Sequence, residues 1–213
     1  MPDRGVAQRD RLVAIADILA GIGVFALLAW SLVHADEPQF QGKAMTARLI
    51  CFPIAVLLVP VLAWLLRGRH GPRPYPHGIG LLVTVPFLVD LLGNAAGWYH
   101  DFEHFDDWVH AGSPALFVAA VTLLFATLAV SSWIVWLLAI GVGSTGHILW
   151  ELIEYWLLVR FRADELGLTL ADTLSDLGWG LVGSVVGVAM AVLVAGPRAS
   201  DVRGPAAAGT PQE

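Results

Sequence analysis

Six long stretches of apolar residues take up nearly the whole chain, and they constrain its fold more than any other feature. Each has about the 20 residues needed to cross the hydrocarbon core of a bilayer. They run near Leu12 to Val33, Ala47 to Leu66, Gly78 to Trp98, Pro114 to Val130, Trp133 to Val159 and Ala171 to Ala195. Hydrocarbon offers no hydrogen-bond partner to free backbone groups, and the alternation typical of barrel strands is absent. We therefore expect an all-α bundle of about six transmembrane helices.

The composition also requires a non-aqueous neighbour. Of the 213 residues, 57% are hydrophobic and only 14% are charged, and the mean hydropathy is +0.70. A soluble protein of this length buries only about 70% of its unfolded surface, which would leave too much apolar surface in water. The expected partner is therefore the lipid bilayer. A net charge of -6 without a large basic cluster argues against nucleic acid, and the single cysteine, Cys51, excludes a disulfide scaffold.

The connections between the stretches predict the domain organisation and the orientation. We expect residues 1–11 to be a cytoplasmic N-terminus, 12–195 a transmembrane domain, and 196–213 a disordered, Pro-rich cytoplasmic tail. Lys and Arg are more frequent on the side of the termini, so the positive-inside rule places both termini in the cytoplasm. An alternative is that the first stretch is a cleaved signal peptide, although its length and Asp17 favour a retained helix.

Two details of the stretches carry further predictions. Only Ser131 and Ser132 separate the fourth stretch from the fifth. One helix of that combined length would overshoot the bilayer, so we expect a helical hairpin. Pro53 and Pro60 are expected to bend the second helix, which a membrane bundle tolerates.

Ionisable residues in these stretches gather at one predicted depth, near the outer helix ends. Such residues are costly in a membrane, so each needs a partner or a function. The residues concerned are Asp90 in the third stretch, Asp106 and His110 before the fourth, His147, Glu151 and Glu154 on one face of the fifth, and Asp172 and Asp176 at the start of the sixth. We expect only Arg160 and Arg162 to lie near them. Protons, a cation or a basic ligand must then compensate the clustered acids.

Several of the polar residues also have purely structural interpretations. Thr169 and Asp172 fit a capping box at a helix start. Asp17 is expected to reach the interface or to pair with Arg11, and we leave it out of the candidate site. The acidic stripe of the sixth stretch continues into Gly180, Gly183 and Gly187, a spacing that predicts close approach of another helix.

Three blocks of the sequence resemble a known family. Residues 105–110, 150–155 and 172–176 resemble the Asp-Lys-x-x-His, Glu-Leu-x-Glu-aromatic and Asp-Thr-x-x-Asp elements of YjdF-type bacterial inner-membrane proteins. The chain is more distantly similar to VanZ-like proteins. The blocks cover roughly residues 78–195, leaving the first helix outside, and imply a multi-pass protein of the bacterial inner membrane. Asp107 stands where the family usually has Lys, and the missing cation strengthens the case for a bound metal or proton.

Three functions stay open at this stage. The first is a metal-dependent enzyme that acts on a lipid or lipid-linked substrate, because hard oxygen ligands with one or two imidazoles suit a divalent metal. Its expected metal ligands are Asp90, Asp106, His110, Glu151, Asp172 and Asp176, with His147 or Glu154 as general base. The second is a proton- or cation-coupled transporter with Asp90, Glu151 and Asp176 as relay groups. The third is a structural or assembly subunit whose polar cluster holds helices together.

Overall fold

The computed structural model describes residues 4–41, 43, 45–70, 75–126, 130–156 and 169–195, without the side chains of residues 4, 66–70 and 154. This part of the chain is all-helical. The helices are α1 (Arg4–Val33), α2 (Met45–His70), α3 (His77–Ala95), the short α4 (Trp98–Asp101), α5 (Phe105–Phe125), α6 (Ser132–Glu154) and α8 (Leu170–Ala195). All of them except α4 are long and apolar enough to cross a membrane. The predicted six-helix transmembrane bundle is confirmed, while the predicted tail lies outside the described residues.

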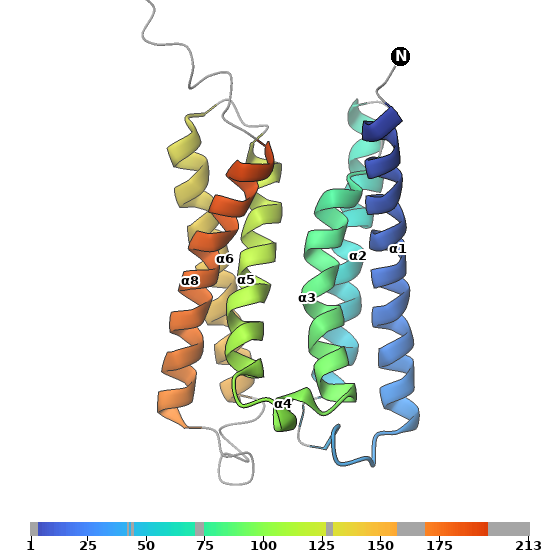
Figure 1. Cartoon of the computed structure of the whole chain (residues 1–213), viewed down its shortest axis with the longest axis vertical. Coiled ribbons are helices and arrows are strands. Elements are labelled where there is room, and N and C mark those ends of the chain that lie inside the picture. The colour runs from blue at the N-terminus through green and yellow to red at the C-terminus, as the bar shows by residue number, and fades with distance from the viewer. Residues whose placement is uncertain are drawn as a thin grey trace, which may run out of the picture.

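The bundle consists of two three-helix halves, α1–α2–α3 and α5–α6–α8 (Figure 1). Helices α3 and α5 make the main backbone contact between the halves. Each half has its own apolar core. The first core contains Val24, Leu28, Phe52, Val56 and Leu91, and the second contains Val118, Ala139 and Val188. The beginning of α1 and the end of α8 lie at the same end of the bundle (Figure 1).

Several helix ends differ from the apolar pattern, and three of these differences bear on the site or the fold. Helix α5 begins at Phe105 instead of Pro114, and α1 begins at Arg4 instead of Leu12. Carboxylates in the first turn of α5 are favourable there because they face the positive end of the helix dipole. Helix α3 ends at Ala95 because Gly97 adopts a left-handed φ of 75°, which separates it from α4. Hydropathy alone therefore left the start of α5, which carries Asp106 and His110, outside the predicted helix.

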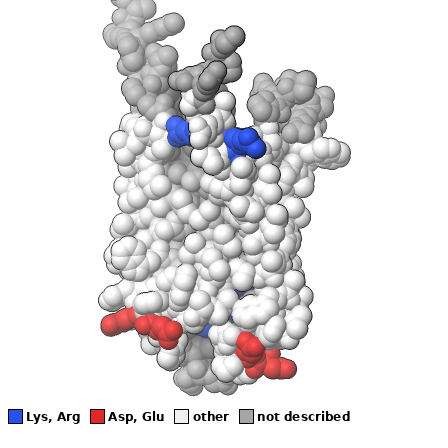
Figure 2. All heavy atoms as spheres, turned by 45° about the vertical axis from the view of Figure 1, so that its right-hand side comes forward, with Lys and Arg blue, Asp and Glu red and all other residues white. Residues whose placement is uncertain are grey.

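The surface of the bundle is suited to lipid. In Figure 2 the acidic and basic atoms lie towards the two ends, and the wide band between them is uncharged. Large apolar side chains such as Leu19, Leu58 and Leu137 are more than half exposed, with exposed fractions of 60%, 52% and 61%. In water such a surface would be unfavourable, whereas acyl chains cover it at no cost.

Candidate functional site

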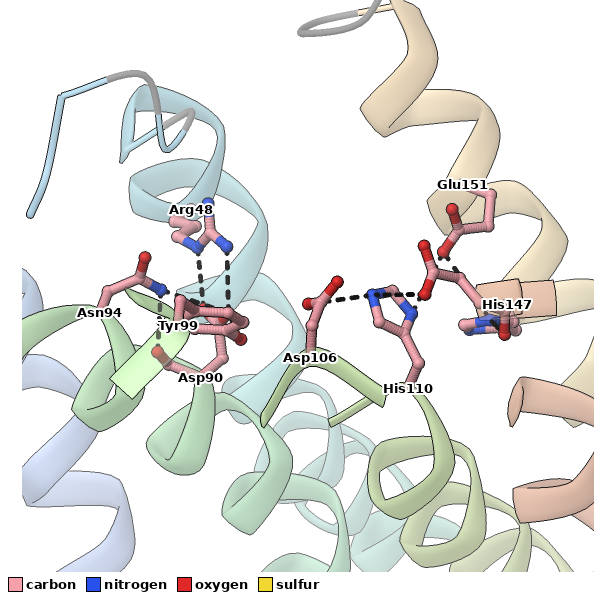
Figure 3. A network of polar contacts seen from close by, with 9 residues as sticks. Arg48, Asp90, Asn94, Tyr99, Asp106, His110, His147 and Glu151 are labelled. Atoms are coloured by element: carbon pink, nitrogen blue, oxygen red, sulfur yellow. Dashed lines mark hydrogen bonds and ion pairs between the residues drawn. The ribbon is translucent and has the colours of Figure 1, made fainter. Parts of the chain in front are cut away.

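Two polar clusters lie at one end of the bundle, one in each half (Figure 3). The first, the Arg48 cluster, is centred on Asp90 of α3. Arg48 Nε donates to Asp90 Oδ2 at 2.8 Å and Arg48 Nη2 to Asp90 Oδ1 at 3.0 Å. Tyr99 Oη donates to Asp90 Oδ1 at 2.8 Å, and Asn94 Nδ2 donates to the Asp90 carbonyl oxygen at 2.8 Å. Arg48 Nη1 donates to the carbonyl oxygen of Lys43.

The Arg48 cluster corrects one expectation from the sequence. Asp90 has a bidentate guanidinium partner in Arg48, so the view that only Arg160 and Arg162 lie near the acids is wrong for Asp90. Arg160 and Arg162 themselves lie outside the described residues. Burial, and then the Asp90 carboxylate, raise the pKa of Tyr99. Its hydroxyl therefore stays protonated and continues to donate to Asp90.

The second group, the His110 cluster, consists of Asp106, His110, His147, Glu151 and Asp176. The two nitrogens of His110 face different carboxylates. His110 Nδ1 lies 3.3 Å from Glu151 Oε1, while Nε2 lies 3.5 Å from Asp106 Oδ1 and 3.9 Å from Asp176 Oδ1. His147 Nε2 lies 3.7 Å from the same Glu151 oxygen. Three helices far apart in sequence thus bring five predicted site residues together.

Helical spacing and close helix packing explain why these side chains meet. Asp106 and His110 are one turn apart on α5, as are His147 and Glu151 on α6, so each pair shares a helix face. Asp176 comes from α8, which packs tightly against α5. A Cβ at Gly183 would overlap the Ala111 carbonyl oxygen of α5. The predicted close approach of the glycine stripe is confirmed.

The His110 cluster contains two overlapping sets of possible metal ligands. One set is Asp106, His110 and Asp176, and the other is His110, His147 and Glu151; the ligand atoms of each lie within 4.8 Å of one another. Because the sets use opposite nitrogens of His110, the geometry divides the single ligand set expected from the sequence. His147 Nε2 donates to the Asp176 carbonyl oxygen at 2.8 Å, which engages that nitrogen. The Asp106–His110–Asp176 set is therefore the better candidate.

Glu151 is placed to orient His110 in such a site. It is 6% exposed, and its Oε1 atom accepts no hydrogen bond from the described residues. A histidine that binds metal through one nitrogen usually donates its other N–H to a carboxylate. The Oε1 atom is placed to receive that proton from His110 Nδ1. The buried carboxylate would then orient the ring and fix its tautomer.

The other predicted site residues lie in different places. Asp90 belongs to the Arg48 cluster. Asp172 lines the cleft described below, and its backbone N–H donates to Thr169 Oγ1 at 3.1 Å, which supports the capping interpretation. Glu154 is the last residue of α6, and its side chain lies outside the described part of the chain. Asp107 is paired with His104 at 3.1 Å and belongs to neither set of possible metal ligands found among the described residues.

A cleft of about 570 Å³ joins the two polar clusters. It lies between the halves of the bundle, lined by residues of α2, α3, α5 and α6. At its polar end are residues of both clusters together with Lys43 and Asp172. Farther along the helices it is lined by Phe87, Phe117, Val121 and Val142. The cleft is therefore amphiphilic, with its charged groups at one end.

A further polar contact, which the sequence analysis left out, lies near the ends of the helices far from these clusters. Asp17 of α1 is 9% exposed, and its Oδ2 atom lies 2.8 Å from His77 Nδ1 of α3. Its partner is thus His77 rather than Arg11. Burial, and then the Asp17 carboxylate, raise the pKa of Tyr75 to about 12. The two residues are 60 positions apart, so no local pattern could have revealed the pair.

Residues 16–196 match the family described as "Predicted membrane protein (DUF2238)". The chain belongs to this family. The resemblance to YjdF-type proteins is confirmed because they form this DUF2238 family, whereas the more distant similarity to VanZ-like proteins finds no support. The match begins within α1, so it extends beyond the predicted limit at residue 78 and includes every residue of both clusters. No curated protein and no solved structure matches the chain significantly.

Proposed function

We propose that this DUF2238 protein is a membrane enzyme that holds a divalent metal with Asp106, His110 Nε2 and Asp176. It acts on the polar part of a lipid or lipid-linked substrate. The observation that carries the proposal is the position of this ligand set at the polar end of an amphiphilic cleft. A metal next to a cleft of this volume can meet a substrate whose remainder is apolar.

The balance of charge in the His110 cluster favours a cation. Asp106, Glu151 and Asp176 surround the two imidazoles of the cluster, and Asp172 is a fourth carboxylate close enough to act on Asp176. Four carboxylates carry more negative charge than two imidazoles can offset, even if both are protonated. Like charges in a low-dielectric site require protons or a bound cation. A divalent ion would supply the missing charge.

The ligand types indicate what the ion would do. Two carboxylates and one imidazole leave coordination positions for water and substrate, which is typical of catalytic sites. The bound ion would activate a water molecule or polarise a phosphoryl or carbonyl oxygen of the substrate. His147 also lines the cleft, and since its Nε2 donates to a carbonyl, its Nδ1 is the nitrogen able to accept a proton. Glu151 acts as the positioning residue for His110.

Metal analysis of the purified full chain tests this function. We expect about one divalent ion per chain after incubation with Mn²⁺ or Zn²⁺ and removal of excess metal. Asp106→Asn and Asp176→Asn should each abolish the bound ion, whereas the control Asp107→Asn, on the same turn of α5, should retain it. A wild-type protein that folds but takes up none of the common divalent metals would contradict the proposal.

A proton- or cation-coupled transporter is the second candidate. The Asp17–His77 pair favours it, because it supplies ionisable groups near the end of α3 far from Asp90. In this alternative, Asp17 and His77 would be proton-relay positions. Metal-free protein in liposomes that shows pH-driven cation flux, lost in Asp17→Asn, would support transport over the enzyme.

We also propose that the protein lies in the bacterial inner membrane with both termini in the cytoplasm. Arg9 and Arg11 lie at the end of the bundle where the chain begins, and the loop with Asp101 and Glu103 lies at the opposite end. With Cys51→Ser as background, single cysteines can report the orientation. An impermeant maleimide should label Glu103→Cys in intact cells and Gln8→Cys only after lysis. The reverse pattern would overturn the orientation.

A further inference from the structure

We propose that the cleft binds a lipid bearing a phosphate group, with the phosphate at the polar end and one hydrocarbon chain lying between α2 and α6. The inference rests on the proposed function because it takes this lipid as the substrate of the metal site. To the proposed function the inference adds a negatively charged head group and a path for the hydrocarbon chain. It also names the residues that contact the head group and the hydrocarbon chain.

The whole cleft is long enough for a head group with an attached hydrocarbon chain. Along α5 its lining extends from Asp106 to Val121, which is about 22 Å of helix at 1.5 Å per residue. Phe117 lines the same helix face between them, and Phe87 and Val142 line the neighbouring helices. A ligand with a charged group at one end and a long apolar remainder matches this distribution.

The hydrocarbon chain would enter the cleft from the bilayer, between α2 and α6. Helices α2 and α6 flank it without extensive backbone contact, and the rings of Phe52 and Trp150 bridge them with centroids 6.3 Å apart. Gly146 of α6 lines the cleft and is exposed, and a Cβ built on it would meet no atom within 4 Å. A chain can therefore reach the cleft beside Gly146 without leaving the hydrocarbon.

The charges at the polar end favour a phosphate. Lys43 Nζ lies over the Tyr99 ring, 5.2 Å from its centroid, and Lys43 lines the cleft together with Arg48. In Figure 2 basic atoms at the lower end lie recessed between two acidic groups. Across the cleft, Asp106 and His110 would present the metal. A phosphate between Lys43 and the metal has a cation on each side, whereas without the metal the carboxylates of Asp106 and Asp172 repel it.

Lipid binding to the full-length protein in detergent, followed by native mass spectrometry, tests this inference. The probes are lauroyl lysophosphatidate, lauroylglycerol, which has the same chain but no phosphate, and inorganic phosphate. We expect Mn²⁺-loaded protein to bind lysophosphatidate at least tenfold more tightly than either of the others. Lys43→Gln should weaken lysophosphatidate binding about threefold to tenfold and leave lauroylglycerol unchanged.

Two glycines of α6 provide a matched pair for the path of the chain. Gly146→Leu fills the cleft and should weaken binding of both lauroyl lipids about tenfold. Gly141→Leu adds the same side chain to an exposed position that also has no atom within 4 Å and does not line the cleft, so binding should be unchanged. Both variants should keep their metal. Equal losses in the two variants would overturn the proposed path.

The remaining outcomes separate this inference from the proposed function. Equal affinity for lysophosphatidate and lauroylglycerol would overturn the phosphate specificity. Inorganic phosphate that competes as well as lysophosphatidate would show a free-phosphate site and overturn the lipid. Metal-loaded protein that binds no lysophosphatidate contradicts the inference alone. Gly146-dependent lipid binding in protein that never takes up metal contradicts the proposed function and the contact between phosphate and metal, and leaves only the path of the hydrocarbon chain supported.

Discussion

The Arg48 cluster and the His110 cluster lie at the same end of the bundle and both contribute residues to the same cleft. They differ in how their buried carboxylates are compensated. In the Arg48 cluster, one carboxylate is matched by one guanidinium and further hydrogen bonds. In the His110 cluster, carboxylates from three helices converge on one imidazole, and the buried Glu151 Oε1 atom accepts no hydrogen bond from the part of the chain that the structure describes.

This difference separates a structural brace from a candidate reaction site. A matched pair such as Arg48 and Asp90 ties α2 to α3, and its loss exposes a charge to a low-dielectric environment. An acid-rich group is under electrostatic stress when empty and is relieved when a cation binds. Variants of the Arg48 cluster should therefore lower stability, whereas variants of the His110 cluster should lower ligand binding.

The largest effect on stability is expected at the Arg48–Asp90 pair. Arg48→Met leaves Asp90 buried without its cation and should lower the free energy of unfolding by about 3–5 kcal/mol. Equilibrium unfolding in mixed micelles measures this loss. Lys43→Met is the control and should cost less than about 1 kcal/mol. The double variant Arg48→Met/Asp90→Asn should recover part of the loss, and a double variant no more stable than Arg48→Met would argue against the brace.

The next effect separates stability from binding in the His110 cluster. Asp176→Asn should remove the bound metal but change the free energy of unfolding of the metal-free protein by less than about 1 kcal/mol, because it relieves repulsion among the carboxylates. Element analysis and unfolding of the same samples check both parts. A loss comparable with that of Arg48→Met would place Asp176 in a second structural brace.

A smaller effect is expected for the residue that orients His110. Glu151→Gln keeps the shape of the side chain but weakens its acceptor, so the metal affinity should fall about 10-fold to 100-fold without being abolished. Titration with a competing metal chelator measures this change. Complete loss of metal would instead identify Glu151 as a direct ligand and favour the His110–His147–Glu151 set.

Two glycines of α8 test whether close packing of this helix against His147 is needed for stability and metal binding. A Cβ at Gly180 would overlap the His147 ring, so Gly180→Ala should cost about 1–3 kcal/mol. Displacing the ring also breaks its hydrogen bond to the Asp176 carbonyl oxygen, which should shift Asp176 and weaken metal binding. Gly178→Ala is the control, because a Cβ there meets no atom within 4 Å. Thermal unfolding and metal titration of both variants should therefore diverge, and equal behaviour would show that His147 moves freely.

The smallest effect concerns the polar contact far from the two clusters. The pKa of Tyr75 is raised to about 12 from a value of 10.0, so the folded state holds its proton more tightly than the unfolded state. The stability it contributes is complete below pH 10 and is lost as the pH rises towards 12. Absorbance titration should show a tyrosine transition near pH 12 that disappears in Tyr75→Phe and moves to lower pH in Asp17→Asn.

The sequence predicted the fold well because hydropathy reports the length and number of membrane-spanning helices directly. It predicted helix ends less well, since the start of α5 at Phe105 lies in a polar turn stabilised by the helix dipole. Helical periodicity also predicted that His147 and Glu151 would share one face. These are local properties of the chain.

Tertiary pairing was much harder to predict. Arg48 and Asp90 are 42 positions apart, and a single Arg at the start of an apolar stretch gives no sign of its partner. The same holds for Asp17 and His77. The opposite roles of the two His110 nitrogens depend on contacts from three helices. The sequence alone therefore could not show which acids are candidate metal ligands and which one, Glu151, faces the other nitrogen of His110.

The seam between α5 and α8 has a consequence for biosynthesis. Asp106 and His110 enter the membrane with the fourth spanning helix and Glu151 with the fifth, but Asp176 arrives with the sixth. The carboxylates translated early are therefore part of an incomplete bundle until α8 inserts and Gly183 and Gly187 pack against the Ala111 and Ala115 carbonyl oxygens. The sixth of these spanning helices thus completes the site, and a chain truncated before α8 would hold Asp106, His110 and Glu151 in the bilayer without Asp176.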